Sequence, residues 1–262
     1  MPEDDAGEVE EPLYGGLEGG RVIRIGRTVR RPAGAWTASV HSLLEHVRAK
    51  GFPAPAALGI DDQGRERLEF IEGEAGLRPW PAILLRVAGV MQIGRLLRAY
   101  HEAVADFRPA RSRWRDGSGS PTPGQIVLHG DFAPYNVIWK GAQIVGVIDW
   151  ELARPGAAIE DVAFAAFQCV PLRPDAAAKE AGFSAPPDRA TRLAAFSEAY
   201  GRHGPRTIAQ AAVRVLAEDL VRMERLGGAG EEPWAGFLRR GLRERTRAEA
   251  AWLRQWLERA KS

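Results

Sequence analysis

The 262-residue sequence predicts an α+β protein in which the strands come first and the helices follow. Three observations carry this prediction. Before residue 72, short runs rich in β-branched residues alternate with turns that contain glycine. After residue 82, long segments repeat apolar residues at helical spacing. Between those segments, residues 137–139 and 144–148 are strand candidates joined by the turn 140–143, which predicts a hairpin.

The composition excludes several classes of protein. The net charge is only +2, so we expect no nucleic-acid partner. No run of about 18 apolar residues occurs, so we expect no membrane partner either. Residues 1–11 are acidic and lack the layout of a signal peptide. The single cysteine, Cys169, forms no internal disulfide, which fits the cytoplasm, and its apolar neighbours predict a packed core thiol.

The first 72 residues contain the parts of a small antiparallel sheet. A Gly-rich segment that includes Gly19 and Gly20 precedes the first clear strand candidates, and glycine lets backbone N–H groups approach phosphate oxygens closely. Two later strand candidates look like the last two of a five-stranded sheet. The four strand candidates are residues 21–25, 28–31, 58–60 and 67–71.

Helices are predicted on both sides of the hairpin. Residues 37–50 form the one helix expected within the sheet region, because Val40, Leu43, Leu44 and Val47 fall at helical spacing. Residues 108–124, rich in Pro, Ser, Gly and Arg, predict a mobile surface loop. The other predicted helices are residues 82–107, 161–169, 188–200, 207–226 and 233–260.

Three polar residues lie where phosphoryl transfer from a nucleotide would need them. Asp131 follows a short apolar run, Asn136 comes five positions later, and Asp149 ends the second arm of the hairpin. That chemistry needs a carboxylate to orient the attacking hydroxyl and oxygen ligands to hold Mg²⁺ against the phosphates. An Asn carbonyl and an Asp carboxylate are ligands of the type that Mg²⁺ prefers.

These segments resemble one known family. The sequences HGDFAPYN at 129–136 and IDWE at 148–151, with Gly156 and Asp161 beyond them, resemble the aminoglycoside phosphotransferase and choline kinase-like family. The resemblance implies a bilobal, protein kinase-like fold. Its small N-lobe would be residues 1–72, with an antiparallel sheet and one helix, and its larger, mainly helical C-lobe would be residues 73–262.

The resemblance also implies roles in catalysis and nucleotide binding. Asp131 would be the catalytic residue, and Asn136 and Asp149 would bind the metal. Arg30, with Arg31 as the alternative, would grip the nucleotide phosphates together with the backbone of the glycine loop. Residues that would form the hinge between the lobes and hold the nucleobase include Glu69 and Ile71.

One position departs from the family pattern. Members of the family carry a glutamate on the N-lobe helix that pairs with the phosphate-binding base, and the apolar pattern places Val40 in that position. His41 and Glu45 are the alternatives for this role.

Other residues have a structural interpretation beside a functional one. In the family the residue that matches Asp161 braces the catalytic loop, and His101 is expected to be a structural hydrogen-bonding residue. Glu151 is either a substrate contact or part of a solvated turn. Five arginines of the last helix form a face that is more often solvated than a site, and this basic wall counts against an aminoglycoside as substrate. They are Arg239, Arg240, Arg243, Arg245 and Arg247.

The sequence therefore predicts a small-molecule kinase. It would use ATP or GTP with Mg²⁺ and phosphorylate a hydroxyl of a small acceptor, such as an aminoglycoside-like or other hydroxylated metabolite. The sequence predicts no oligomeric state. The alternative is a catalytically quiet kinase-like protein that acts by binding, for example as an immunity factor. A protein kinase acting on Ser or Thr is disfavoured, because the Asp-Phe-Gly and Ala-Pro-Glu segments are missing.

Overall fold

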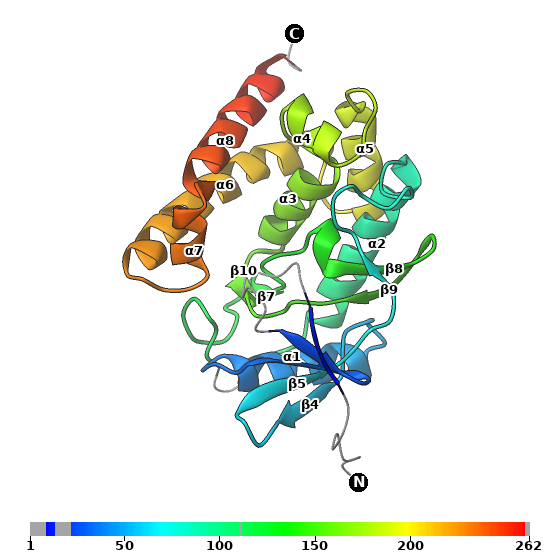
Figure 1. The fold of residues 1–262 in the computed structure, drawn as a ribbon. Helices are drawn as coiled ribbons and strands as arrows, with labels where there is room; N and C mark the ends of the chain where they lie inside the picture. Colours follow the sequence, from blue (N-terminus) through cyan, green and yellow to red (C-terminus); the bar gives the residue numbers. More distant parts are fainter. Residues whose placement is uncertain (1–8, 14–21, 110–111, 260–262) are drawn as a thin grey trace.

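The computed structural model describes residues 9–13, 22–109 and 112–259. A twisted sheet with one helix lies at one end of the molecule, and a larger, mainly helical part lies at the other (Figure 1). This is the α+β, kinase-like arrangement that the sequence predicts. No described helix has the length and hydrophobicity needed to cross a bilayer.

The sheet is five-stranded and antiparallel, in the order β1-β2-β3-β5-β4. The helix of this end is α1 (Thr37–Ala49). Its Val40, Leu43, Leu44 and Val47 are inaccessible to solvent. This is the apolar stripe expected of a helix that covers a sheet. The strands are β1 (Glu10–Pro12), β2 (Ile23–Ile25), β3 (Thr28–Pro32), β4 (Ala57–Ile60) and β5 (Arg65–Glu69).

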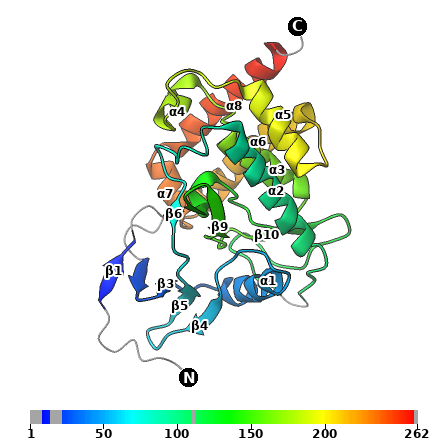
Figure 2. The ribbon, with the colours of Figure 1, turned by 90° about the vertical axis from the view of Figure 1, so that its right-hand side faces the viewer.

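The helical part is built on pairs of packed helices. α2 packs against α5, and α3 against α6, which in turn packs against α8. In Figure 2 these helices lie above the sheet and α1. The helices are α2 (Val87–Ala103), α3 (Ala158–Cys169), α4 (Asp175–Glu180), α5 (Arg189–Tyr200), α6 (Pro205–Gly228), α7 (Trp234–Arg239) and α8 (Leu242–Arg259).

Two small sheets hold the loops between β7 and α3. The predicted hairpin is β8 (Val137–Lys140) and β9 (Gln143–Val147), and β6 (Glu74–Ala75) pairs with β8. β7 (Ile126–Leu128) pairs with β10 (Arg154–Gly156). Residues 129–136 and 148–153 are thereby anchored at both ends.

Two predicted elements differ from the structure, and one short helix was not predicted. The helix expected over 233–260 is two helices, because Gly241 adopts a φ of 73° between α7 and α8. The predicted loop 108–124 is not a free surface loop where it is described. Its Trp114 is buried, and the N–H of Arg113 donates a hydrogen bond of 2.9 Å to Ser39 Oγ of α1. The short α4 has no predicted counterpart.

Candidate active site

The loop after β7 is shaped by a glycine and an aspartate. Gly130 has a φ of 82°, and a Cβ there would lie 2.1 Å from the carbonyl oxygen of Leu152, so no other residue fits. The backbone N–H groups of His129 and Gly130 donate to the two carboxylate oxygens of Asp161, at 2.8 and 3.0 Å. Asp161, at the start of α3, thus fixes the backbone that carries Asp131.

Asp161 is itself held as a buried anion. Burial alone would raise its pKa, but the hydrogen bond and charge of His101 and the charge and backbone N–H of His129 outweigh it, so the pKa of Asp161 lies below its ordinary value. His101 Nε2 lies 3.4 Å from the carboxylate, and its Nδ1 lies 2.9 Å from the hydroxyl of Tyr200. Both side chains are buried, and His101 is a structural hydrogen-bonding residue.

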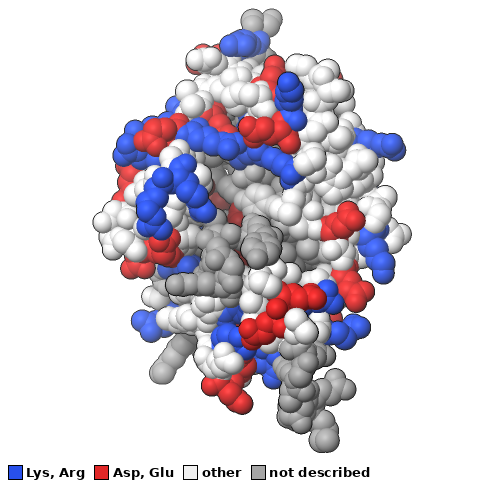
Figure 3. All heavy atoms as spheres, viewed as in Figure 1, with Lys and Arg blue, Asp and Glu red and all other residues white. Residues whose placement is uncertain are grey.

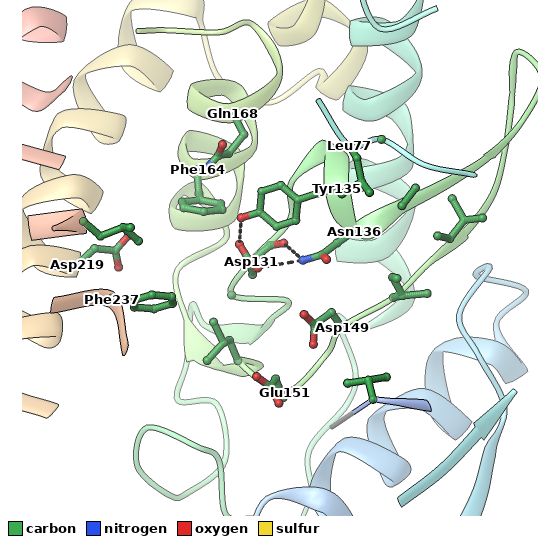
Figure 4. Close-up of a pocket in the computed structure, with 18 of the residues that line it drawn as sticks. Leu77, Asp131, Tyr135, Asn136, Asp149, Glu151, Phe164, Gln168, Asp219 and Phe237 are labelled. Carbon is green, nitrogen blue, oxygen red and sulfur yellow. Dashed lines mark hydrogen bonds between the residues drawn. The ribbon is translucent and has the colours of Figure 1, made fainter. Parts of the chain in front are cut away.

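Asp131 receives two side-chain hydrogen bonds. The hydroxyl of Tyr135 donates to Oδ1 at 2.6 Å, and Nδ2 of Asn136 donates to Oδ2 at 2.9 Å (Figure 4). Nδ2 also donates to the Asp131 carbonyl oxygen at 2.9 Å, which directs Oδ1 of Asn136 away from Asp131. Burial raises the pKa of the Asp131 carboxyl well above its usual value, against the lowering effect of the Tyr135 hydrogen bond.

Asp149 faces the same space from the end of the hairpin. Its φ of 65° makes it the one non-glycine residue in the described chain with a left-handed backbone. The carboxylate points into the cavity below Asn136 (Figure 4). Nη1 of Arg31 lies 3.1 Å from its Oδ1, so the strand β3 and the hairpin meet at this point.

The two arginines of β3 point to opposite faces of the sheet. Side chains alternate along a strand, and Val29 and Arg31 line the cavity while Arg30 does not. Arg30 lies 3.4 Å from Asp61 Oδ2, in the turn between β4 and β5. Of the two arginines, the alternative Arg31 therefore faces the cavity, and Arg30 does not.

Arg31 also has a buried donor without a hydrogen-bond partner among the described residues. Its Nη2 is shielded from solvent and makes no hydrogen bond within the described residues. A buried guanidinium donor without a partner is costly, and it is common where a ligand supplies the missing acceptor.

The carboxylate that holds Arg31 comes from a strand, not from a helix. Nε of Arg31 donates to Oε2 of Glu66, its antiparallel neighbour on β5, and Nε2 of His41 lies 3.0 Å from Oε1. Val40 is packed in the core and Glu45 is exposed. Sequence reasoning missed Glu66. Only the pairing of Arg31 with Glu66 across the two strands could have pointed to it, and that pairing is known only once the strand register is known.

A cavity of about 800 Å³ joins these residues. At its sheet end the cavity is lined by apolar side chains from the sheet and the hairpin, as small-molecule sites commonly are. Glu69 lines it but is tied to the N–H of Ala56 and to Arg48, each at 3.0 Å. Gly19 and Gly20 lie outside the described residues. The apolar lining there is Val22, Val29, Ile71, Ile138 and Ile148.

Comparisons with known proteins agree with this geometry. Residues 120–206 match the model of the phosphotransferase enzyme family. The trifolitoxin immunity protein of Rhizobium leguminosarum bv. trifolii is 38% identical over 192 residues, which cover 70% of this chain and 72% of that protein. The chain belongs to the phosphotransferase enzyme family. The resemblance predicted from residues 129–161 is confirmed.

Solved structures of this family share the fold at low identity. A choline/ethanolamine kinase family protein from Mesorhizobium loti is 15% identical with a TM-score of 0.57, over 95% of this chain and 93% of that one. An aminoglycoside phosphotransferase from Streptomyces rimosus, in complex with ADP and streptomycin, is 17% identical with a TM-score of 0.53, over 81% and 92% of the two chains.

In the present chain, the helical end of the cavity is lined by α3, α6 and α7, which contribute Phe164, Gln168, Asp219 and Phe237 (Figure 4). Glu151 lies between this end and the sheet. It is buried and ion-paired with Arg115 at 2.5 Å, so it is not a solvated turn residue.

Most of the arginine face of α7 and α8 is ion-paired surface. Basic and acidic side chains alternate over these helices at the upper rim of the hollow (Figure 3). Arg239 pairs with Glu232 at 2.5 Å, and Arg247 with Glu224 at 2.7 Å. Of the five arginines, Arg245 alone is among the residues that line the described cavity.

The donor set at the centre of the cavity suits Mg²⁺. Oδ1 of Asn136 and the carboxylate of Asp149 are hard oxygen ligands, and Mg²⁺ commonly uses one or two such ligands with nucleotide phosphates and water. Within the described residues no cluster of three or more His, Cys, Asp or Glu could hold a metal alone. A metal here would depend on the nucleotide for the rest of its coordination.

Proposed function

We propose that the protein transfers the γ-phosphoryl group of ATP or GTP to a hydroxyl of a small molecule. The observation that carries the proposal is the position of Asp131. It is held by Tyr135 and Asn136 in one cavity with Asp149 and Arg31. Phosphoryl transfer depends mainly on positioning and on electrostatic stabilisation, and these residues supply both.

Each group has one task in this proposal. The nucleobase packs against Ile71 and Val29, and Arg31 donates to the phosphates while Glu66 holds its guanidinium in place. Asn136 and Asp149 would hold Mg²⁺, which would supply positive charge to offset the charge that develops on the phosphates. Asp131 orients the acceptor hydroxyl for in-line attack and accepts its proton.

A second candidate comes from the relative in Rhizobium. Its name is that of an immunity protein. By this candidate the chain protects its host by binding a harmful compound without transferring phosphate. The ion pair of Arg31 with Glu66 favours the enzyme. Glu66 supplies the carboxylate partner that the N-lobe helix lacks at Val40, so the missing helix glutamate is no argument for a catalytically quiet protein.

Two measurements decide between the candidates. The first is thermal stability with ATP, GTP and Mg²⁺. The second is nucleoside diphosphate release over a panel of hydroxylated amines, sugars and antibiotics, with Asp149→Asn as a control. A Mg²⁺-dependent stabilisation together with acceptor-dependent release supports the kinase. Stabilisation by nucleotide without release over the panel supports the binding protein, and no stabilisation by any nucleotide contradicts the kinase.

A further inference from the structure

At the helical end of the cavity, one buried arginine has a donor that the described residues leave without a hydrogen bond. Arg173 follows α3 and is only 7% exposed, and its guanidinium stacks 4.1 Å from the ring centre of Phe167. Its Nε is shielded from solvent and donates no hydrogen bond within the described part of the chain. An arginine has five N–H donors, so a ligand acceptor is the expected partner.

Glu249, the acid that pairs with Arg173, does not satisfy this donor. Oε2 of Glu249, on α8, lies 3.6 Å from Nε, which is beyond hydrogen-bonding distance. The other oxygen of Glu249 accepts from Nε of Arg245 at 3.1 Å. One carboxylate is thus shared by two guanidinium groups.

The charge of this end of the cavity is positive. Arg78, Arg173 and Arg245 line it near Glu249, and Asp219 and Arg222 of α6 line it as well. Asp219 and Arg222 pair with each other at 2.5 Å, so arginines remain in excess around Arg173. Glu180 pairs with Arg78 at 3.1 Å from an exposed position outside the lining. Burial lowers the pKa of Arg173 to about 10, which shows that Glu249 offsets only part of the cost of burying this charge.

The positive end lies next to the catalytic group. Arg173 is near enough to Tyr135 for its charge to lower the pKa of that phenol, which burial otherwise raises. The hydroxyl of Tyr135 donates to Asp131. Arg173, Tyr135 and Asp131 all line the cavity, so a molecule that contacts Arg173 shares one space with Asp131.

We propose that Arg173 binds an anionic group, a carboxylate or a phosphate, carried by the hydroxylated acceptor. This inference rests on the proposed kinase function and names its substrate class. A planar guanidinium matches both groups with paired hydrogen bonds. A polycationic acceptor is disfavoured, because it would place its charges beside three arginines.

Binding measured without turnover tests the proposal. The protein is saturated with Mg²⁺ and a non-hydrolysable ATP analogue, so that the nucleotide site is filled. The probes are 4-hydroxybutyrate and its amide, and glycerol 3-phosphate and glycerol, titrated by ligand-observed NMR. The wild type is expected to bind at least one anionic probe about tenfold or more tightly than its neutral counterpart. The pair that shows the preference identifies the anionic group.

Arg173→Gln is expected to remove this preference, whereas Arg247→Gln keeps it. Arg247 is a matched control on α8, paired with Glu224 on the surface. Glu249→Gln removes the carboxylate that competes with an anionic ligand for Arg173, so it is expected to strengthen the preference for anionic probes. This variant tests the proposal if Arg173→Gln fails to fold. Equal binding of charged and neutral probes by the wild type, or an unchanged preference in Arg173→Gln, would overturn the proposal.

Failure of this inference is separable from failure of the kinase assignment. Asp131→Asn is expected to abolish acceptor-dependent diphosphate release and to leave anionic probe binding intact. Release that survives in Asp131→Asn contradicts the proposed function and leaves the Arg173 result standing. Release that depends on Asp131 but occurs with neutral or cationic acceptors and never with anionic ones contradicts the Arg173 proposal alone.

Discussion

At the scale of single residues, β3 separates two arginines that look equivalent in sequence. Arg31 faces the cavity and Arg30 faces the turn at Asp61. Arg31→Gln is expected to weaken nucleotide binding by roughly tenfold to a hundredfold, because a charged hydrogen-bond donor to phosphate is lost. Arg30→Gln is expected to leave the nucleotide affinity nearly unchanged. Calorimetric titration of both variants with nucleotide measures the two affinities. Loss of affinity in Arg30→Gln but not in Arg31→Gln would reverse the assignment.

Glu66 is a positioning residue, because it acts through Arg31. Glu66→Gln is expected to lower kcat by roughly one to two orders of magnitude, since a misplaced phosphate contact costs about that much. The control is Glu45→Gln, because Glu45 is exposed on the neighbouring helix α1. Steady-state kinetics together with nucleotide affinity separate the two effects. A Glu66→Gln protein with wild-type kcat would show that Arg31 needs no carboxylate partner.

These two residues also show where sequence reasoning ends. Asp131, Asn136 and Asp149 were expected in one site, and they line one cavity. Their spacing within a short hairpin makes this placement local. Arg31 could have been chosen over Arg30, because alternation along the strand places it on the same face as apolar Val29, and small-molecule sites are mostly lined by apolar side chains. Glu66 could not, because its pairing depends on strand register.

At the scale of elements, one aspartate at the start of α3 holds the catalytic loop. Because the folded pKa of Asp161 lies below its unfolded value, its ionised form stabilises the protein above a pH of about 4. That contribution is lost as the pH falls through the folded pKa. Urea unfolding between pH 5 and 3 is expected to show wild type and Asp161→Asn converging in stability as the solution is acidified. A stability difference that stays constant over this range would contradict the account.

Helices and strands with clear periodicity were predictable, and breaks were not. The stripe of Val40, Leu43 and Leu44 predicts α1 because the same residues form its buried face. Cys169 is buried as expected, and burial raises its pKa to about 12, so its thiol stays protonated and inert. The break at Gly241 was missed, because apolar spacing continues across it from α7 into α8.

At the scale of the whole molecule, the sheet and the helical part together line one cavity. The cavity runs between them, with Asp131 and Asp149 at its middle. The apolar sheet end and the basic helical end differ in chemistry, which lets one cavity receive two different molecules. The family is evident from the loops at the middle, whereas the proposed acceptor site combines side chains that α8 and the segment after α3 bring together from distant sequence.

Transfer of a radiolabelled γ-phosphate from ATP tests the central claim most directly. The label is followed to an acceptor that stimulates diphosphate release, in the wild type and in Asp131→Asn. We predict label on the acceptor with the wild type, and a rate at least about a hundredfold lower in the variant, with nucleotide affinity retained. Label transfer at the wild-type rate by Asp131→Asn would contradict the account.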